Sequence, residues 1–303
     1  MKTELTVFQE PIDFSKIKLD IKDYHKIESL VEKYYDYNDG CILHPHWKRL
    51  LQRKIDGGTF ETMGWLGGGY PQKTDYRQPH PDIFDFKDYF VNLDTVDIQS
   101  ALYQFYTMEE ICAINDFYFS NITQHINIIE IGGGYGRLAF PFLALFGEMC
   151  HYISVDYAPT SLTFAPQIIR QAFPYLKVMD TLNLKDNFED YNFISLPTWE
   201  INKIKSSFYD LGTNIHSFQE MEHKSVEFYA QELHRTVNES GLIYIINNPP
   251  EKDKGYTNHN YYNLENYFGE AIFSKKYPIG ADWEKICGVP TLERAFYNKE
   301  RTK

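Results

Sequence analysis

Residues 127–138 read Asn127-Ile128-Ile129-Glu130-Ile131-Gly132-Gly133-Gly134-Tyr135-Gly136-Arg137-Leu138. The β-branched residues between positions 126 and 131 predict a short buried strand. Glycines at 132, 134 and 136 then turn the chain, and the apolar residues from 138 to 146 predict a helix. A turn of this kind lets backbone N–H groups approach a ligand closely and points a helix N-terminus at it.

The spacing of the turn, E-x-G-x-G-x-G, narrows the choice of ligand. It differs from the G-x-G-x-x-G of the dinucleotide fingerprint, and no Lys-Ser/Thr pair follows it as in a P-loop. A second apolar run, 152–155, ends in Asp156, 20 residues after Gly136. An acidic residue at the tip of the neighbouring strand can accept hydrogen bonds from two ribose hydroxyls.

Glycine turn, helix, strand and terminal acid together resemble the class I S-adenosylmethionine-dependent methyltransferases. The resemblance implies an α/β fold with a Rossmann-like seven-stranded sheet whose last strand is antiparallel. It implies S-adenosylmethionine as cofactor, with the methionine part over Gly132 to Gly134 and the ribose at Asp156. The predicted cofactor-binding residues are Glu130, Gly132, Gly133, Gly134, Gly136, Asp156, Tyr157, Leu196, Pro197 and Asn214. A glycine turn that only packs the helix on the strand is the alternative.

Composition restricts the partners. The 303 residues carry a formal charge of −12, which argues against nucleic acid and anionic membrane surfaces and favours a small-molecule or neutral glycan acceptor. The four cysteines lie far apart without a C-x-x-C pair, as expected of reduced thiols in a cytoplasmic protein. The first residues lack the apolar segment of a signal peptide, and the longest apolar run is too short for a transmembrane segment. The sequence leaves the oligomeric state open, and a homo-oligomer is one of the alternatives.

Two regions are expected. Residues 1–120 form an N-terminal region of helices and loops, mainly a helical cover over the acceptor side. Within it we expect an amphipathic helix that ends near residue 40, a long loop rich in glycine, proline and aromatics over 41–82, and helical pattern from 88 to 121. Residues 121–303 form the cofactor-binding methyltransferase domain.

The strands and helices of the second region follow from its apolar runs. Two segments, 175–179 and 191–196, qualify as the third strand, and we favour the second because Pro197 closes it. We also expect helices over 161–173 and 227–237, strands over 208–214 and 242–246, and a terminal hairpin from 271–273 and 294–297.

The string Asn214-Ile215-His216-Ser217-Phe218-Gln219-Glu220-Met221, with the strand over 242–246, is similar to the sugar O-methyltransferase family of polysaccharide gene clusters. The resemblance covers residues from about 120 to 250. It implies methylation of a sugar hydroxyl on a nucleotide sugar or on a capsule or surface polysaccharide.

A sugar hydroxyl is a poor nucleophile at neutral pH, so a general base with a pKa near 7 would help to remove its proton. His216 follows the fourth strand, and imidazole titrates in that range. We hypothesise that His216 is the base and that Glu220 orients it or grips acceptor hydroxyls. Two structural alternatives stay open: a hydrogen-bonded His216, and a capping box from Ser217 to Glu220.

Trp65, Tyr70, His259 and Tyr262 are the predicted acceptor-binding wall. No spacing among the carboxylates singles out a metal site, so no divalent metal is predicted. The Asn-Asn-Pro-Pro string after residue 246 follows the fifth strand and lacks the aromatic residue of DNA amino-methyltransferases. The alternatives to O-methylation are an N-methyltransferase for an amino sugar or small amine, a non-catalytic cofactor-binding protein and, last, a nicotinamide oxidoreductase.

Overall fold

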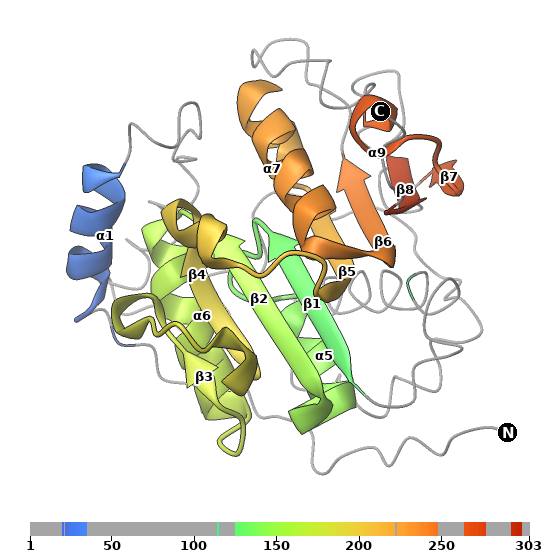
Figure 1. Ribbon diagram of the computed structural model, residues 1–303. Helices are drawn as coiled ribbons and strands as arrows, with labels where there is room; N and C mark the ends of the chain where they lie inside the picture. The colour runs from blue at the N-terminus through green and yellow to red at the C-terminus, as the bar shows by residue number, and fades with distance from the viewer. Residues whose placement is uncertain are drawn as a thin grey trace, which may run out of the picture.

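The computed structural model describes residues 20, 22–34, 114, 125–221, 223–247, 264–276 and 292–298. The strands in these residues form one eight-stranded sheet with the order β3-β4-β2-β1-β5-β6-β8-β7 (Figure 1). They are β1 (Ile126–Ile131), β2 (Cys150–Asp156), β3 (Val178–Met179), β4 (Phe193–Pro197), β5 (Tyr209–Ile215), β6 (Val237–Asn247), β7 (Phe273–Lys276) and β8 (Leu292–Tyr297).

The direction of the strands identifies the type of sheet. Strands β3, β4, β2, β1, β5 and β6 pair in parallel, whereas β8 runs antiparallel to β6 and to β7. The strand order reverses at β1, which lies between β2 and β5. These features confirm the predicted α/β, Rossmann-like methyltransferase sheet.

Helices cover both faces of the sheet (Figure 1). The α-helices are α1 (Tyr24–Lys33), α5 (Ala139–Phe146), α6 (Pro159–Ala172), α7 (His223–Thr236) and α9 (Glu265–Phe268). The 3₁₀ helices are η7 (Gly147–Met149), η8 (Thr181–Asn183), η9 (Phe188–Asp190), η10 (Thr198–Lys203) and η11 (Phe218–Glu220). Helices α5 and α6 pack on one face, and α7 with α9 packs on the other.

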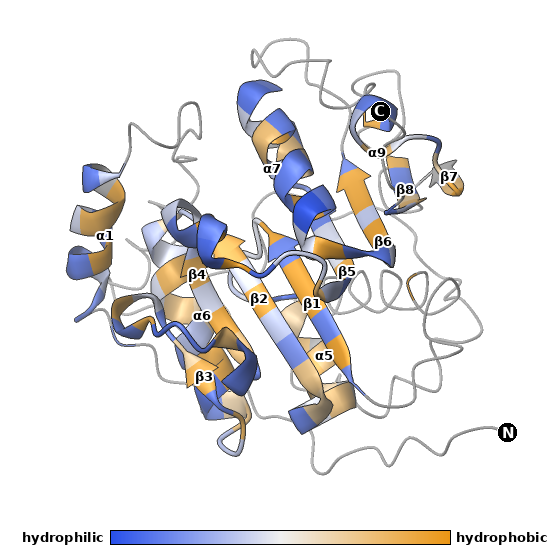
Figure 2. Cartoon of the chain, viewed as in Figure 1, coloured by the Kyte–Doolittle hydropathy of each residue, from blue (hydrophilic) through white to orange (hydrophobic). Residues whose placement is uncertain are grey.

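Burial on both faces explains the composition of the strands. The central strands are almost wholly buried, and Figure 2 shows hydrophobic residues in β1 and β2 interrupted by hydrophilic ones. Helix α7 also carries both kinds of residue, because it packs on the sheet with one side only. Among the described helices, none is both long and apolar enough to cross a bilayer.

Both segments proposed for the third strand are strands. The favoured segment is β4, while the other supplies β3 at the edge of the sheet, so the described sheet has one strand more than the seven expected. Asn192 holds the pair together: its Oδ1 accepts from the Lys177 N–H at 3.0 Å, and its own N–H donates to the Lys177 carbonyl at 2.9 Å. The terminal antiparallel pair is confirmed as β7 and β8, although β7 spans Phe273–Lys276 and shares only Phe273 with the predicted segment 271–273.

Most of residues 1–120 lie outside the described residues, so the expected N-terminal cover is represented by residues 20, 22–34 and 114 alone. Ile114 is fully buried in the core cluster that contains the apolar residues of α5. Helix α1 packs against α6, where the Asp20 N–H donates to Gln167 Oε1 at 2.7 Å and Gln167 Nε2 donates to the Asp20 carbonyl at 2.8 Å. Tyr34 stacks on Trp199 with ring centroids 4.8 Å apart.

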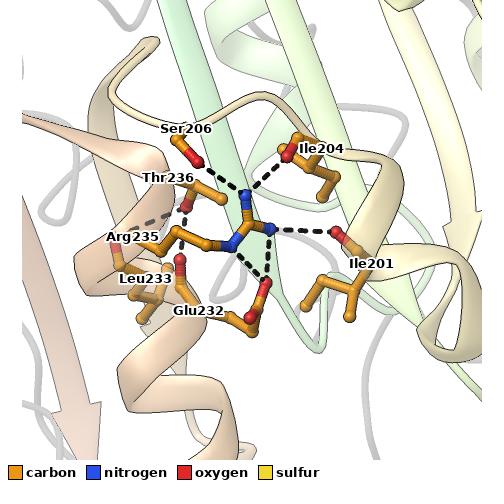
Figure 3. A network of polar contacts seen from close by, with 7 residues as sticks. All are labelled: Ile201, Ile204, Ser206, Glu232, Leu233, Arg235 and Thr236. Carbon is orange, nitrogen blue, oxygen red and sulfur yellow. Dashed lines mark hydrogen bonds and ion pairs between the residues drawn. The ribbon is translucent and has the colours of Figure 1, made fainter.

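A polar network fixes the far end of α7 to the η10 segment (Figure 3). The guanidinium of Arg235 donates to the Ile204 carbonyl at 2.6 Å, to Ser206 Oγ at 3.1 Å and to the Ile201 carbonyl at 3.2 Å. Glu232, one turn earlier, pairs with the same guanidinium. The Ile201 carbonyl also accepts from the Ile204 N–H within the 3₁₀ turn, so the network adds a second donor to it and ties the end of η10 to α7.

Candidate cofactor and acceptor site

The glycine turn lies where β1 ends. Gly132, Gly134 and Gly136 have φ angles of +78°, +56° and +84°, a region that side chains with a Cβ rarely adopt. The Gly132 N–H donates to the Val155 carbonyl at 2.7 Å, and the Gly136 N–H donates to the Gly133 carbonyl at 3.0 Å. These bonds hold the turn against β2 and place the start of α5 directly behind it.

Two of the glycines are also required by their own protein neighbours. A Cβ at Gly133 would lie 2.1 Å from Ser154 Oγ and 2.8 Å from Glu130 Oε2. A Cβ at Gly132 would lie 2.2 Å from Ser217 Oγ. The turn is therefore packed against β1, β2 and the segment after β5, in addition to any ligand that it could hold.

Glu130 lies beneath the turn and is 3% exposed. Its Oε2 accepts a hydrogen bond of 2.6 Å from the hydroxyl of Tyr152. Burial and the Glu130 carboxylate raise the pKa of Tyr152 well above its ordinary value, so this hydroxyl stays protonated and keeps donating. Glu130, at the end of β1, thus connects the start of the glycine turn to β2 through Tyr152.

Asp156, at the end of β2, joins the turn to the start of α6. Its Oδ2 accepts from the Gly134 N–H at 2.9 Å, and its Oδ1 accepts from the N–H groups of Tyr157 and Ala158 at 2.7 and 2.9 Å. Burial raises the pKa of Asp156, although the three N–H donors oppose the shift. The structure therefore brings the predicted acid beside the predicted glycine turn.

The residues around Asp156 close the same edge of the sheet. Leu196 and Pro197 end β4 and pair with Val155 and Asp156. Tyr157 is 8% exposed because it packs in a cluster with Ile27 and Val31 of α1 and with Leu162; Trp199 packs against this cluster. The described N-terminal helix thus lies over the Tyr157 end of the site.

The side chain of Asn214 is fully buried and fully engaged. Its Nδ2 donates to the Ile131 carbonyl at 2.9 Å and to Ser217 Oγ, and its Oδ1 accepts from the Phe218 N–H at 2.9 Å. Ser217 Oγ also donates to the Ile131 carbonyl, at 3.2 Å, and makes no cap to η11. The capping box that starts at Ser217 is therefore wrong, because Asn214 supplies the cap and Ser217 turns toward β1.

His216 has a strained backbone and an unusual electrostatic environment. Its φ is +61°, and its N–H donates to the Ile246 carbonyl at 2.8 Å. The residue is half-buried with Nδ1 shielded from water. Burial, and then the charge of Arg137, lower the pKa of His216 to about 3, with a hydrogen bond to Gln219 opposing them. The imidazole is therefore neutral at pH 7 but a weak base, and its catalytic role stays a prediction.

Arg137 is a residue that the sequence analysis missed. It follows the glycine turn, and its charge lowers the pKa of His216 and opposes the rise in the pKa of Tyr152. Its guanidinium is therefore close enough to both side chains to affect their protonation. The available signal was its place as the only basic residue of the 127–138 stretch.

The remaining predicted site residues fall beyond what the structure describes. These are Trp65, Tyr70, His259 and Tyr262, and for Glu220 the side chain. Within the described residues, no three His, Cys, Asp or Glu side chains come together as metal ligands. The described part of the site is therefore the glycine turn, Asp156 with its neighbours, and the segment from Asn214 to Met221.

No protein-family model matches the sequence, and no curated protein matches it either. Solved structures with a similar chain trace include the geranyl diphosphate C-methyltransferase of Streptomyces coelicolor A3(2), solved with Mg²⁺, geranyl diphosphate and S-adenosyl-L-homocysteine. It is 10% identical, with a TM-score of 0.44 over 62% of this chain and 79% of that one. A S-adenosylmethionine-dependent methyltransferase from Aquifex aeolicus is 14% identical, with a TM-score of 0.41 over 62% and 88%.

The [4+2]-cyclase SpnF is also similar, at 10% identity and a TM-score of 0.47 over 68% of this chain and 84% of that one. The fold assignment itself rests on the strand order, the antiparallel β8 and the glycine turn at the end of β1. Because one fold hosts many activities, the substrate has to be argued from the site.

Proposed function

We propose that this protein is a S-adenosylmethionine-dependent methyltransferase. The observation that carries the proposal is the Asp156 carboxylate, which is bonded to the Gly134 N–H at the edge where β1 and β2 both end. Ligands of open α/β sheets bind outside the carboxyl ends of the strands, at the point where the strand order reverses. The ribose would lie at Asp156, the methionine part over the glycine turn, and the adenine near Tyr157 and Pro197.

The acceptor that we propose is a sugar hydroxyl, on a nucleotide sugar or on a capsule or surface polysaccharide. Support comes from the string between Asn214 and Met221 and from the charge of −12, which disfavours polyanionic acceptors. In the reaction the hydroxyl oxygen bonds to the methyl carbon while the carbon–sulfur bond breaks and its electron pair stays on sulfur. Positioning supplies much of the rate of such an in-line displacement.

N-methylation of an amino sugar or a small amine is the second candidate. It is favoured by the state of His216, whose pKa of about 3 makes it a poor acceptor of a hydroxyl proton. A neutral amine carries its own lone pair and needs less assistance from a base. Unchanged turnover of an amine by the His216→Asn variant would support N-methylation.

Cofactor binding and methyl transfer can be tested separately. We expect calorimetry to show one site for S-adenosylhomocysteine per chain, and NADH to give no heat at the same concentrations. The wild-type protein, incubated with methyl-labelled S-adenosylmethionine and a panel of nucleotide sugars, amino sugars and capsule fragments, should transfer the label to an oxygen, located by mass spectrometry. Label on nitrogen would favour the second candidate. Absence of S-adenosylhomocysteine binding would contradict both.

A further inference from the structure

Helix α6 begins with three closely spaced hydroxyls, those of Thr160, Ser161 and Thr163. All three residues are at most 2% exposed. Thr163 Oγ1 donates to the Pro159 carbonyl at 2.6 Å, a common local contact of a helical threonine. Within the described residues the hydroxyls of Thr160 and Ser161 make no full hydrogen bond, and a buried hydroxyl in that state needs an explanation.

The start of α6 is capped by Asp156 and not by a side chain of its own. The N-cap residue, Ala158, has no side-chain oxygen, and Pro159 follows it without an N–H. Asp156 Oδ1 accepts from the Ala158 N–H at 2.9 Å instead. In a capping box the third helical residue reaches back to this same N–H, and in α6 that residue is Ser161. The geometry therefore brings the Ser161 hydroxyl to the Asp156 carboxylate.

The electrostatics of Asp156 agree with this placement. Burial raises the pKa of Asp156, while three backbone N–H groups and then the Ser161 hydroxyl lower it. Ser161 Oγ is shielded from water and has no full hydrogen bond to another described residue. No other described acceptor therefore competes with Asp156 for the Ser161 proton.

The Thr160 hydroxyl meets the glycine turn. Burial raises the pKa of Tyr135, the Thr160 hydroxyl opposes this shift, and the charges of Asp156 and Tyr24, the first residue of α1, add to it. Tyr135 therefore stays protonated at neutral pH. Among the described groups that shift the pKa of Asp156, none is charged. Of the two adjacent hydroxyls, Ser161 is thus the one that acts on the acid.

We propose that Ser161 positions Asp156 for the cofactor ribose by donating its hydroxyl proton to the carboxylate. A carboxylate bonded from both α6 and the glycine turn keeps its charge and its orientation. A charged acceptor binds ribose hydroxyls more strongly than a neutral one. Ser161 is a positioning residue that acts through Asp156 and need not touch the cofactor. The inference rests on the proposed function and deepens it.

The test uses the full-length protein with S-adenosylhomocysteine as the probe. We expect Ser161→Ala to bind it about tenfold more weakly in calorimetry, the effect of losing a hydrogen bond to a charged group. Loss of this donor also raises the pKa of Asp156 further, so the acid is protonated at a higher pH. On acidification, the affinity of the variant should therefore fall at a higher pH than that of wild type.

Two further variants separate the donor from the space that it fills. Ser161→Cys keeps the volume but offers only a weak donor, so it should bind as weakly as Ser161→Ala. Thr163→Ala is the matched control, because its hydroxyl is equally buried on the same helix but bonded to the Pro159 carbonyl. It should bind within twofold of wild type and keep the wild-type pH dependence. Thermal melts check that each variant is folded.

The outcomes distinguish this inference from the function on which it rests. Wild-type affinity in Ser161→Ala would show that the hydroxyl does not act on the cofactor site. Weaker binding with an unshifted pH dependence, or wild-type affinity in Ser161→Cys, would reduce the role of Ser161 to packing. If Ser161→Ala did not fold, Ser161→Cys would decide by the same two measurements. A wild type that binds no S-adenosylhomocysteine contradicts the proposed function itself.

Discussion

In the proposed function, Asp156 would use the same two carboxylate oxygens for the fold and for the cofactor. A carboxylate offers about four lone-pair positions, and three backbone N–H groups already use three of them. The Ser161 hydroxyl is a further donor that lowers the pKa of Asp156, so ribose hydroxyls would have to share the carboxylate oxygens with these donors. The acid is therefore part of the fold and the proposed cofactor contact at once.

Asp156→Asn should weaken both cofactor binding and the stability of the fold. An asparagine side chain has a single acceptor oxygen, so its NH₂ group would face either the Gly134 N–H or the N–H pair that begins α6. Hydrogen bonds to charged groups contribute about 1.5–3 kcal/mol, so we expect S-adenosylhomocysteine to bind at least tenfold more weakly and the melting temperature to fall. Calorimetry and thermal melts measure the two effects.

The matched control is Asp180→Asn, since Asp180 also accepts from a backbone N–H, that of Leu182, but at the start of η8. It should lose some stability and keep wild-type affinity. Equal affinities of Asp156→Asn and wild type would remove Asp156 from the cofactor site.

Site residues could be predicted from the sequence where the features that define them lie close together along the chain. The glycine turn and Asp156 were predictable because a local turn and the end of an apolar run define them. The contact of Asn214 with the Ile131 carbonyl joins positions 83 residues apart, and nothing local signals it. The low pKa of His216 was equally hidden, since burial and Arg137 cause it. Imidazole chemistry alone suggested a pKa near 7.

Among the helices and strands, α1 is the element of the N-terminal region that contacts the proposed adenosine end of the site. The sequence predicted an amphipathic helix there, but an amphipathic pattern shows which face of a helix is buried and not which element it packs against. In the structure the apolar face of α1 packs on Tyr157 and Leu162. The docked helix should therefore slow the escape of a bound cofactor.

Ile27→Asp should loosen that contact, because Ile27 is 2% exposed and a carboxylate cannot be buried there without a partner. Burying an isoleucine side chain contributes about 1.5–3 kcal/mol, so we expect at least tenfold weaker S-adenosylhomocysteine binding, mainly through faster dissociation. Ser29→Asp introduces the same group on the exposed face of α1 and should change nothing. Unaltered dissociation in Ile27→Asp would show that α1 has no part in cofactor retention.

The Arg235 network makes a separate prediction about how α7 is held (Figure 3). Arg235→Lys keeps the charge but loses the planar fork that reaches the Ile201 and Ile204 carbonyls together. We expect the free energy of unfolding to fall by about 2 kcal/mol in urea titrations. Arg170→Lys, in the exposed pair with Asp180, should cost less than about 0.5 kcal/mol. If the two variants were equally stable, the network would be dispensable.

For the molecule as a whole, two histidines with lowered pKa values sit at opposite edges of the sheet. His216 lies beyond the end of β5. His151 lies near the start of β2, with Nδ1 2.7 Å from the Tyr191 carbonyl and Nε2 3.3 Å from the Tyr209 hydroxyl. Because a carbonyl can only accept, Nδ1 carries the proton and Nε2 accepts from Tyr209. Burial lowers the pKa of His151, although the Tyr191 carbonyl and Glu189 oppose the shift.

The sign of the pH dependence follows from which state binds more protons. Below pH 6.5, the ordinary histidine value, the unfolded chain takes up protons that folded His151 and His216 do not, so stability is complete above pH 6.5 and is lost as the pH falls toward the folded pKa values. At pH 5.5, one unit below the unfolded value, His216 alone should cost about 1.4 kcal/mol relative to pH 7.5. Urea unfolding at the two pH values measures the difference.

His151→Gln should reduce that difference, since it removes one of the two groups that bind protons more readily in the unfolded chain than in the folded one. Its stability at pH 7.5 should be lower than that of wild type, because the hydrogen bonds to Tyr191 and Tyr209 are disturbed. His25→Gln, whose ring is on the exposed face of α1 with 74% of the side chain accessible, should leave the difference as it is. Equal pH dependence in wild type and His151→Gln would mean that His151 takes up protons as readily in the folded chain as in the unfolded one.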